Sequence, residues 1–134
     1  MTNDDPLIIH SSPHRAGLRV EVHGPGTYEN TLAYWRSIAA TLATLHPRGL
    51  LLVDETTGEP LSPIQWKALV LAMEGTGLEH LRIAHVKPHG LQRIEYCELY
   101  AREAGMEARV FTDEAEADLW LRHGERARTG SDLA

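Results

Sequence analysis

Asp54, Glu55 and Glu59 form an acidic segment that ends shortly before Ser62. Carboxylate oxygens are ligands that magnesium prefers, so this segment could hold a metal ion for phosphoryl transfer. Such a site would also need an acidic pair at the end of the first strand and a Ser or Thr at the end of the strand before Lys87, and the sequence has neither. We therefore interpret the three acids as solvent-exposed loop residues.

Eight histidines and one cysteine are the other groups that could bind a metal or transfer protons. His10 and His14 flank one predicted turn, and His85 and His89 flank another. No His-Glu-x-x-His motif occurs, and no histidine is spaced from the cysteine as a zinc site requires. Cys97 lies with Ile94 and Ala101 on the predicted core side of its helix, which favours a buried structural thiol. We predict no metal, no cofactor and no catalytic residue.

The spacing of apolar residues predicts the strands and helices that position these side chains. In chain order they are strands 7–10 and 18–23 joined by a polar turn, a helix over 28–46, a strand at 50–54, a helix over 62–73, a strand at 81–86, a helix over 91–104, a strand at 108–111 and a helix that starts at Asp113 and ends at Gly124. Residues 50–53 have no polar side, so both faces of this strand must be covered.

This order predicts a single α/β domain over residues 1–123. Its mixed sheet has about five strands, an N-terminal hairpin followed by parallel strands, and is flanked by helices. Residues 124–134 contain mostly charged and small side chains, so we predict a disordered tail.

Composition narrows the class of partner. The net charge is −6, and the two lysines and eleven arginines are spread along the chain, so no basic stripe is available for nucleic acid. No apolar run approaches the length of a membrane span, and the first residues are polar and acidic rather than signal-like. With a single cysteine, these features lead us to expect a cytoplasmic protein.

Ser62 has the sequence context of a helix cap. Pro63 follows it at the first helical position, and Gln65 stands three residues on, which together form a capping box. A cap alone explains the serine, and a phosphate there would also be tolerated by the positive end of the helix dipole.

The helix that follows is apolar on two sides. Its inner face is predicted to hold four residues, Trp66, Leu69, Val70 and Met73, and its other face Ile64, Ala68, Leu71 and Ala72. A surface helix needs only one apolar stripe. The second face indicates either deep burial in this small domain or contact with another protein or a second copy.

The strand at 50–54, the loop after it and the helix that starts at a serine resemble the STAS family, whose best-known members are bacterial anti-sigma-factor antagonists. The likeness covers most of residues 7–122 and is closest to a divergent bacterial branch, through segments 81–86 and 104–121. In the regulatory members a partner kinase phosphorylates the serine at the start of this helix, which the resemblance places at Ser62. The family has Asp before that serine, where this chain has Leu61.

The resemblance also implies a partner surface on this helix. With the acidic loop included, the residues predicted to contact a partner are Glu59, Ser62, Ile64, Trp66, Lys67, Ala68 and Leu71. We therefore expect a non-enzymatic regulatory module that binds a protein or a second copy of itself and is gated by phosphorylation at Ser62. The alternatives are a small apolar ligand or lipid between sheet and helices, and a small enzyme that uses the acidic loop.

Overall fold

The computed structural model describes residues 6–124. In chain order the elements are β1 (Ile8–His14), β2 (Gly17–Pro25), α1 (Tyr28–Leu45), β3 (Gly49–Thr57), α2 (Pro63–Met73), the short 3₁₀ helix η2 (Leu78–His80), β4 (Arg82–Val86), α3 (Tyr96–Glu103), β5 (Glu107–Phe111) and α4 (Glu114–His123). No helix in this part of the chain is long and apolar enough to cross a membrane.

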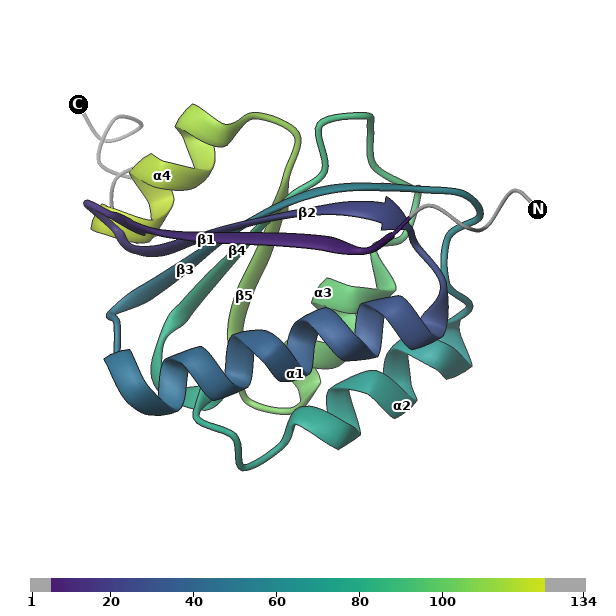
Figure 1. The fold of residues 1–134 in the computed structure, drawn as a ribbon, viewed down its shortest axis with the longest axis horizontal. Coiled ribbons are helices and arrows are strands. Elements are labelled where there is room, and N and C mark those ends of the chain that lie inside the picture. The colour runs from purple at the N-terminus through teal and green to yellow at the C-terminus, as the bar shows by residue number, and fades with distance from the viewer. Residues whose placement is uncertain (1–5, 125–134) are drawn as a thin grey trace.

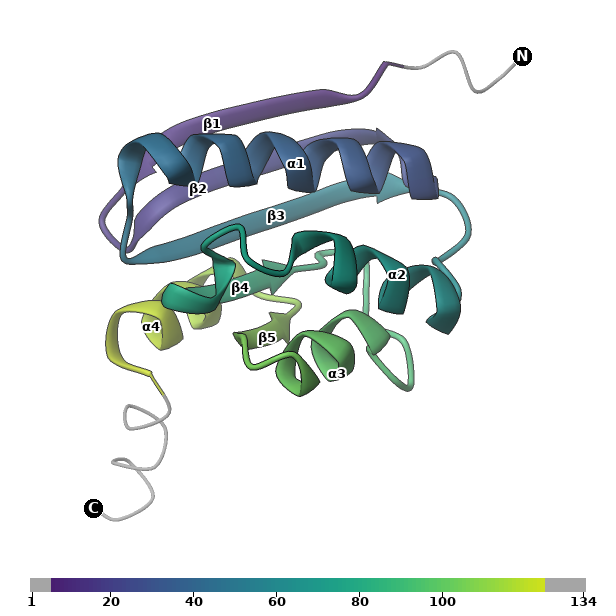
Figure 2. The same ribbon diagram turned by 90° about the horizontal axis from the view of Figure 1, so that it is seen from below.

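The strands form one sheet in the order β1-β2-β3-β4-β5 (Figure 1). β1 is antiparallel to β2, and the other neighbours are parallel, so the predicted mixed sheet in a single α/β domain is confirmed. Each parallel strand lies beside the one before it, and crossovers of one hand then place their helices on one face. α1, α2 and α3 accordingly share a layer in Figure 2, and α4 packs on the opposite face.

β3 is the strand on which both layers depend. Leu50 and Leu52 point into the core beneath the three helices, and Leu51 and Val53 point into the smaller core beneath α4. All four side chains are buried. The unbroken apolar run in the sequence follows from this two-sided burial.

The end of α3 also follows its sequence. Gly105 adopts a positive φ of 89°, and the backbone N–H of Met106 reaches back to the carbonyl of Ala101 at 3.0 Å. This is the left-handed closure that the Gly-Met pair predicts.

The hairpin differs from the prediction. The predicted turn begins at Ser11, but β1 continues to His14, and only Arg15 and Ala16 form the turn. β1 is an exposed edge strand, so its sequence needs no alternation of polar and apolar residues. Pro13 is compatible with such a strand because its missing N–H faces outward.

The start of α3 differs from the prediction, and the end of α4 agrees with it. The predicted helix over 91–104 begins only at Tyr96, because the Glu95 carboxylate binds the Gln92 N–H and the Lys87 ammonium and so stabilises an irregular loop. Ile94, predicted to be on the core side with Cys97, is exposed. Gly124 ends α4 as predicted, and the rest of the predicted disordered tail lies outside the described residues.

A matched pair of leucines tests this assignment of core and surface. Leu52→Ala should lower the free energy of unfolding by about 2 to 5 kcal/mol, because it leaves a cavity in the core. Leu71→Ala, on the outer side of α2, should change it by less than about 0.5 kcal/mol. Urea denaturation of both variants provides the measurement, and similar losses in the two would contradict the assignment.

Candidate functional site

A buried ion pair lies at the carboxyl-terminal edge of the parallel strands. Asp54 in β3 accepts a hydrogen bond from the His85 ring in β4, with 2.8 Å between Oδ2 and Nε2. The side chains are 11% and 5% exposed. The interpretation of Asp54 as a solvated loop residue is therefore wrong. β3 runs on to Thr57, which puts Asp54 on the same inward face as Leu52.

Several side chains hold this pair in place. The other carboxylate oxygen of Asp54 accepts hydrogen bonds from the N–H and the hydroxyl of Thr56, at 3.0 and 2.5 Å. The Tyr34 hydroxyl is 3.5 Å from Oδ2. The His85 ring makes edge contacts with Trp35 and Trp66, whose ring centres are 6.3 and 6.4 Å away. The pair is therefore enclosed by α1, α2 and the two strands.

Both members of the pair are charged at neutral pH. Burial raises the pKa of Asp54, but the hydrogen bond and charge of His85 and the hydrogen bonds from Thr56 together outweigh burial and hold that pKa below its ordinary value. Burial lowers the pKa of His85, and the interactions with Asp54 and Cys97 outweigh it and raise the pKa to about 9. The result is a carboxylate–imidazolium pair in a largely apolar setting.

A second ion pair adjoins the first. Lys87 Nζ lies 2.5 Å from Glu95 Oε1 and 5.5 Å from the centre of the Trp66 ring. The Cys97 thiol donates to the same carboxylate at 3.6 Å, and it is buried as predicted. The two pairs together connect β3, β4 and the start of α3. We call Asp54, His85, Lys87 and Glu95 the polar cluster.

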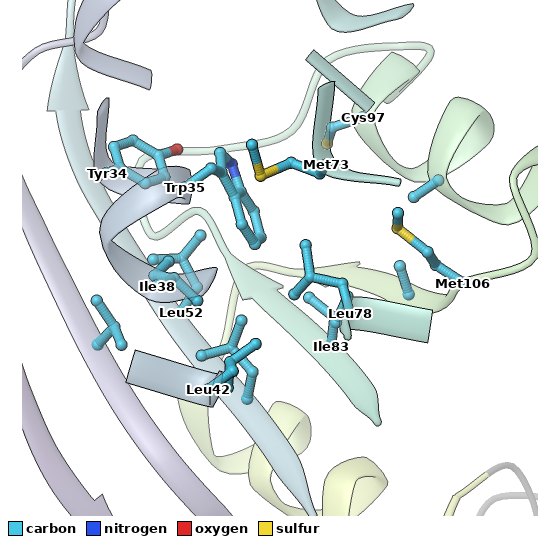
Figure 3. Close-up of a cluster of buried hydrophobic side chains, with 14 of the residues drawn as sticks. Tyr34, Trp35, Ile38, Leu42, Leu52, Met73, Leu78, Ile83, Cys97 and Met106 are labelled. Atoms are coloured by element: carbon cyan, nitrogen blue, oxygen red, sulfur yellow. The ribbon is translucent and has the colours of Figure 1, made fainter. Parts of the chain in front are cut away.

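Two hollows adjoin the polar cluster. One, of about 170 Å³, opens at the sheet edge between Asp54, Lys87 and the loop after β3. The other, of about 50 Å³, is apolar and lies between the sheet, α2 and α3, where Trp35, Met73, Leu78 and Met106 surround it (Figure 3). Ligand pockets usually measure about 300 to 1,000 Å³, so the apolar hollow is far too small for a lipid chain as it stands.

Glu55 and His89 form a separate pair outside the polar cluster. Glu55 alternates to the opposite face of β3 and pairs with His89 at 2.7 Å. The cleft that would join Asp54, Glu55 and His85 in an enzyme is therefore only partly assembled. Within residues 6–124, no three His, Cys, Asp or Glu side chains group in a way that could hold a metal ion.

Ser62 is an exposed helix cap. Its hydroxyl accepts the Gln65 N–H at 3.2 Å, and the Gln65 side chain accepts the Ser62 N–H at 2.9 Å. The predicted capping box is thus present. Ser62 is exposed at the surface, three residues after the exposed Glu59, where a modifying enzyme could reach it.

The outer side of α2 is exposed and apolar. Ile64 and Leu71 are 81% and 57% exposed, and Lys67 and Ala68 between them are exposed as well. We call these four residues the α2 surface. Trp66 was predicted to join them, but it is only 7% exposed, because its ring points inward toward His85.

Comparison with known proteins adds nothing to this geometry. No family model matches the sequence, and no curated protein matches it significantly. The resemblance to the STAS family therefore stays a prediction.

The buried pair predicts a pH dependence of stability. The pKa of His85 is raised from 6.5 to about 9, so its contribution is complete below 6.5 and is lost as pH rises toward 9. The free energy of unfolding should fall by at most about 3 kcal/mol over that window. The contribution of Asp54, whose pKa is lowered from 3.8, is lost only in acid. Urea denaturation at a series of pH values measures the free energy of unfolding in both the alkaline and the acid range.

The matched control is the double variant Asp54→Asn/His85→Gln, in which this pair no longer titrates. Its stability should change less than that of the wild type between pH 6.5 and 9. Equal slopes in the two proteins would mean that the pair does not carry the dependence.

Proposed function

We propose that this chain is a non-enzymatic regulatory module that binds another protein through the α2 surface. The observation that carries the proposal is the exposure of Ile64 and Leu71 on a helix whose inner side already fills the core. The inner side is held by Trp66, Leu69 and Met73. Folding therefore does not require the two outer residues, and their exposure on one side of the same helix, with Ala68 between them, supports a partner surface there.

The chemistry of the α2 surface defines the partner. Its centre is apolar and carries one charge, Lys67, and charged residues are depleted at the centres of protein interfaces. A fitting partner presents an apolar patch with a carboxylate placed to meet Lys67. The resemblance to STAS regulators, which use this helix to meet their partners, supports the same surface.

In this proposal the polar cluster has a structural role. Asp54 is bonded to His85, and Lys87 is bonded to Glu95, so each charge already has a partner inside the cluster. These ion pairs fix the loop after β4 and the start of α3 against the sheet. In this proposal they shape the edge next to Ser62 and take no part in a reaction.

Ser62 supplies the regulation in this proposal. A phosphate on its hydroxyl would add about two negative charges at the start of α2, three residues after Glu59. The helix dipole tolerates the phosphate, so the fold is retained. An acidic partner that approaches Lys67 would be repelled, and the complex would dissociate. A cytoplasmic setting, where kinases act, belongs to the same proposal.

A matched pair of charge substitutions tests the α2 surface. Leu71 and Leu45 lie in the last turns of α2 and α1 and are 57% and 60% exposed. Affinity capture from the native host with Leu71→Lys should lose a protein that the wild type and Leu45→Lys both retain. Loss from both variants, or from neither, would contradict the proposal.

Substitutions at Ser62 test whether phosphorylation there controls partner binding. The captured protein should be retained by Ser62→Ala and lost with Ser62→Asp, because only the second adds negative charge. Loss of the cap in Ser62→Ala should lower the free energy of unfolding by about 0.5 to 2 kcal/mol. Equal retention by both variants, with no phosphate at Ser62 by mass spectrometry, would leave the serine as a helix cap alone.

A further inference from the structure

The two edge strands of the sheet, β5 and β1, differ in whether side chains bind their outward backbone groups. At β5, the Glu98 carboxylate accepts the Val110 N–H at 3.0 Å, and the Arg102 side chain donates to the Ala108 carbonyl at 2.8 Å. Both side chains come from α3, so this helix occupies two of the outward backbone groups of the edge. Such covering protects an edge against pairing with another strand.

The β1 edge is open. Among residues 6–124 we find no side chain bonded to the outward backbone groups of β1, and no helix lies beyond it in Figure 2. The strand spans seven residues and contains no Asp, Glu, Lys or Arg. Proteins normally protect an exposed edge with charges, bulges or a covering element. Here the only protective feature in the strand is Pro13.

The backbone groups that face outward can be assigned. His14 pairs with Gly17 across a two-residue turn, and such a flanking pair exchanges hydrogen bonds. Alternation then turns the backbones of Ile9, Ser11 and Pro13 away from β2. Pro13 agrees with this assignment, because proline can stand only where no N–H is needed for pairing. The free donors are therefore the N–H groups of Ile9 and Ser11.

We propose that β1 pairs antiparallel with β1 of a second copy of this chain, about a two-fold axis at His10. In this register Ile9 of each chain faces Ser11 of the other, so both free N–H groups of each strand find a carbonyl. His10 faces its own copy, and the exposed Ile8 faces Ser12.

Two observations favour a second copy as the strand that pairs with β1. They are the charge of the hairpin and the presence of only one open sheet edge within residues 6–124 of each chain. The chain carries a net charge of −6, but Arg15 and Arg19 of the hairpin neutralise the nearby carboxylates of Asp118, Glu21 and Glu114, so two copies meet at a part that is close to neutral. An uncharged strand also pairs with itself without repulsion. Because α3 covers β5, the pairing uses the open edge of each chain and stops at two. The α2 surface stays free in the dimer.

The first test is the oligomeric state in solution. Light scattering and sedimentation over a concentration series should show a dimer for the wild type. Ser11→Pro should be a monomer with unchanged far-UV circular dichroism, because a proline at an outward position removes a donor of the new pairing and none of the β1–β2 pairing. A monomeric wild type, or a dimeric Ser11→Pro, would overturn the proposal.

Cross-linking tests the register without relying on a disruptive variant. In a Cys97→Ala background, His10→Cys should form an intermolecular disulfide on mild oxidation, because facing Cα atoms at such a position are about 4.5 Å apart. The control is Ser12→Cys, whose copy lies four positions away, about 13 Å along the strand. No disulfide at position 10, or equal disulfide formation at both, would refute the register.

The test of the β1 dimer can be distinguished from the test of partner binding at the α2 surface. Leu71→Lys should remain a dimer while it loses the captured protein. If Leu71→Lys dissociates the dimer and Ser11→Pro does not, the copies associate through α2, and the β1 proposal is wrong.

Discussion

The need to cover β3 on both faces governs the whole structure. Four consecutive buried apolar residues, 50–53, leave this strand no side that water can contact. Crossovers of one hand between successive neighbours put α1, α2 and α3 on one face, so the other face has to be covered by α4. α2 is thus placed against the sheet with one side in the core and one side outward. The candidate partner surface is a consequence of this topology.

The same topology explains where the polar cluster lies. The carboxyl ends of β3 and β4 are adjacent, so Asp54 and His85 meet just above the apolar layer. A buried ion pair contributes little net stability, since desolvation offsets attraction, but loss of one partner leaves a buried charge and is strongly destabilising. The pair therefore specifies one alignment of the two strands. Through Trp66, which contacts both His85 and Lys87, it also fixes the inner side of α2.

Much of the fold could be predicted from local chemistry. The apolar run of β3, the long repeat of α1, the capping box at Ser62 and the glycine closure of α3 each depend on residues close in the chain. The extent of β1 could not be predicted, because an exposed edge strand carries no apolar pattern. The start of α3 could not be predicted either, since it depends on contacts of Glu95 with Lys87 and Gln92.

The candidate site was harder to predict than the fold. Asp54 and His85 are 31 positions apart, and no motif joins them. One signal was available: Asp54 follows Leu52 by two residues and His85 follows Ile83 by two, so strict alternation assigns both to the inward face. For Trp66 the sequence supports two conflicting assignments. Helical spacing assigns it to the core side, and it was also predicted to contact a partner, whereas the structure buries its ring.

The position of α4 in the chain has a consequence for biosynthesis. α4 is made after all five strands, and among the helices of residues 6–124 only α4 covers the face that holds Leu51, Val53, Ala84 and Val86. Until residues 114–123 have emerged from the ribosome and folded, that apolar strip is open to the solvent. A chain in this state is a substrate for chaperones that bind apolar segments, and slow translation at this point exposes it to aggregation. The folding of a single short helix then covers the second face of the sheet.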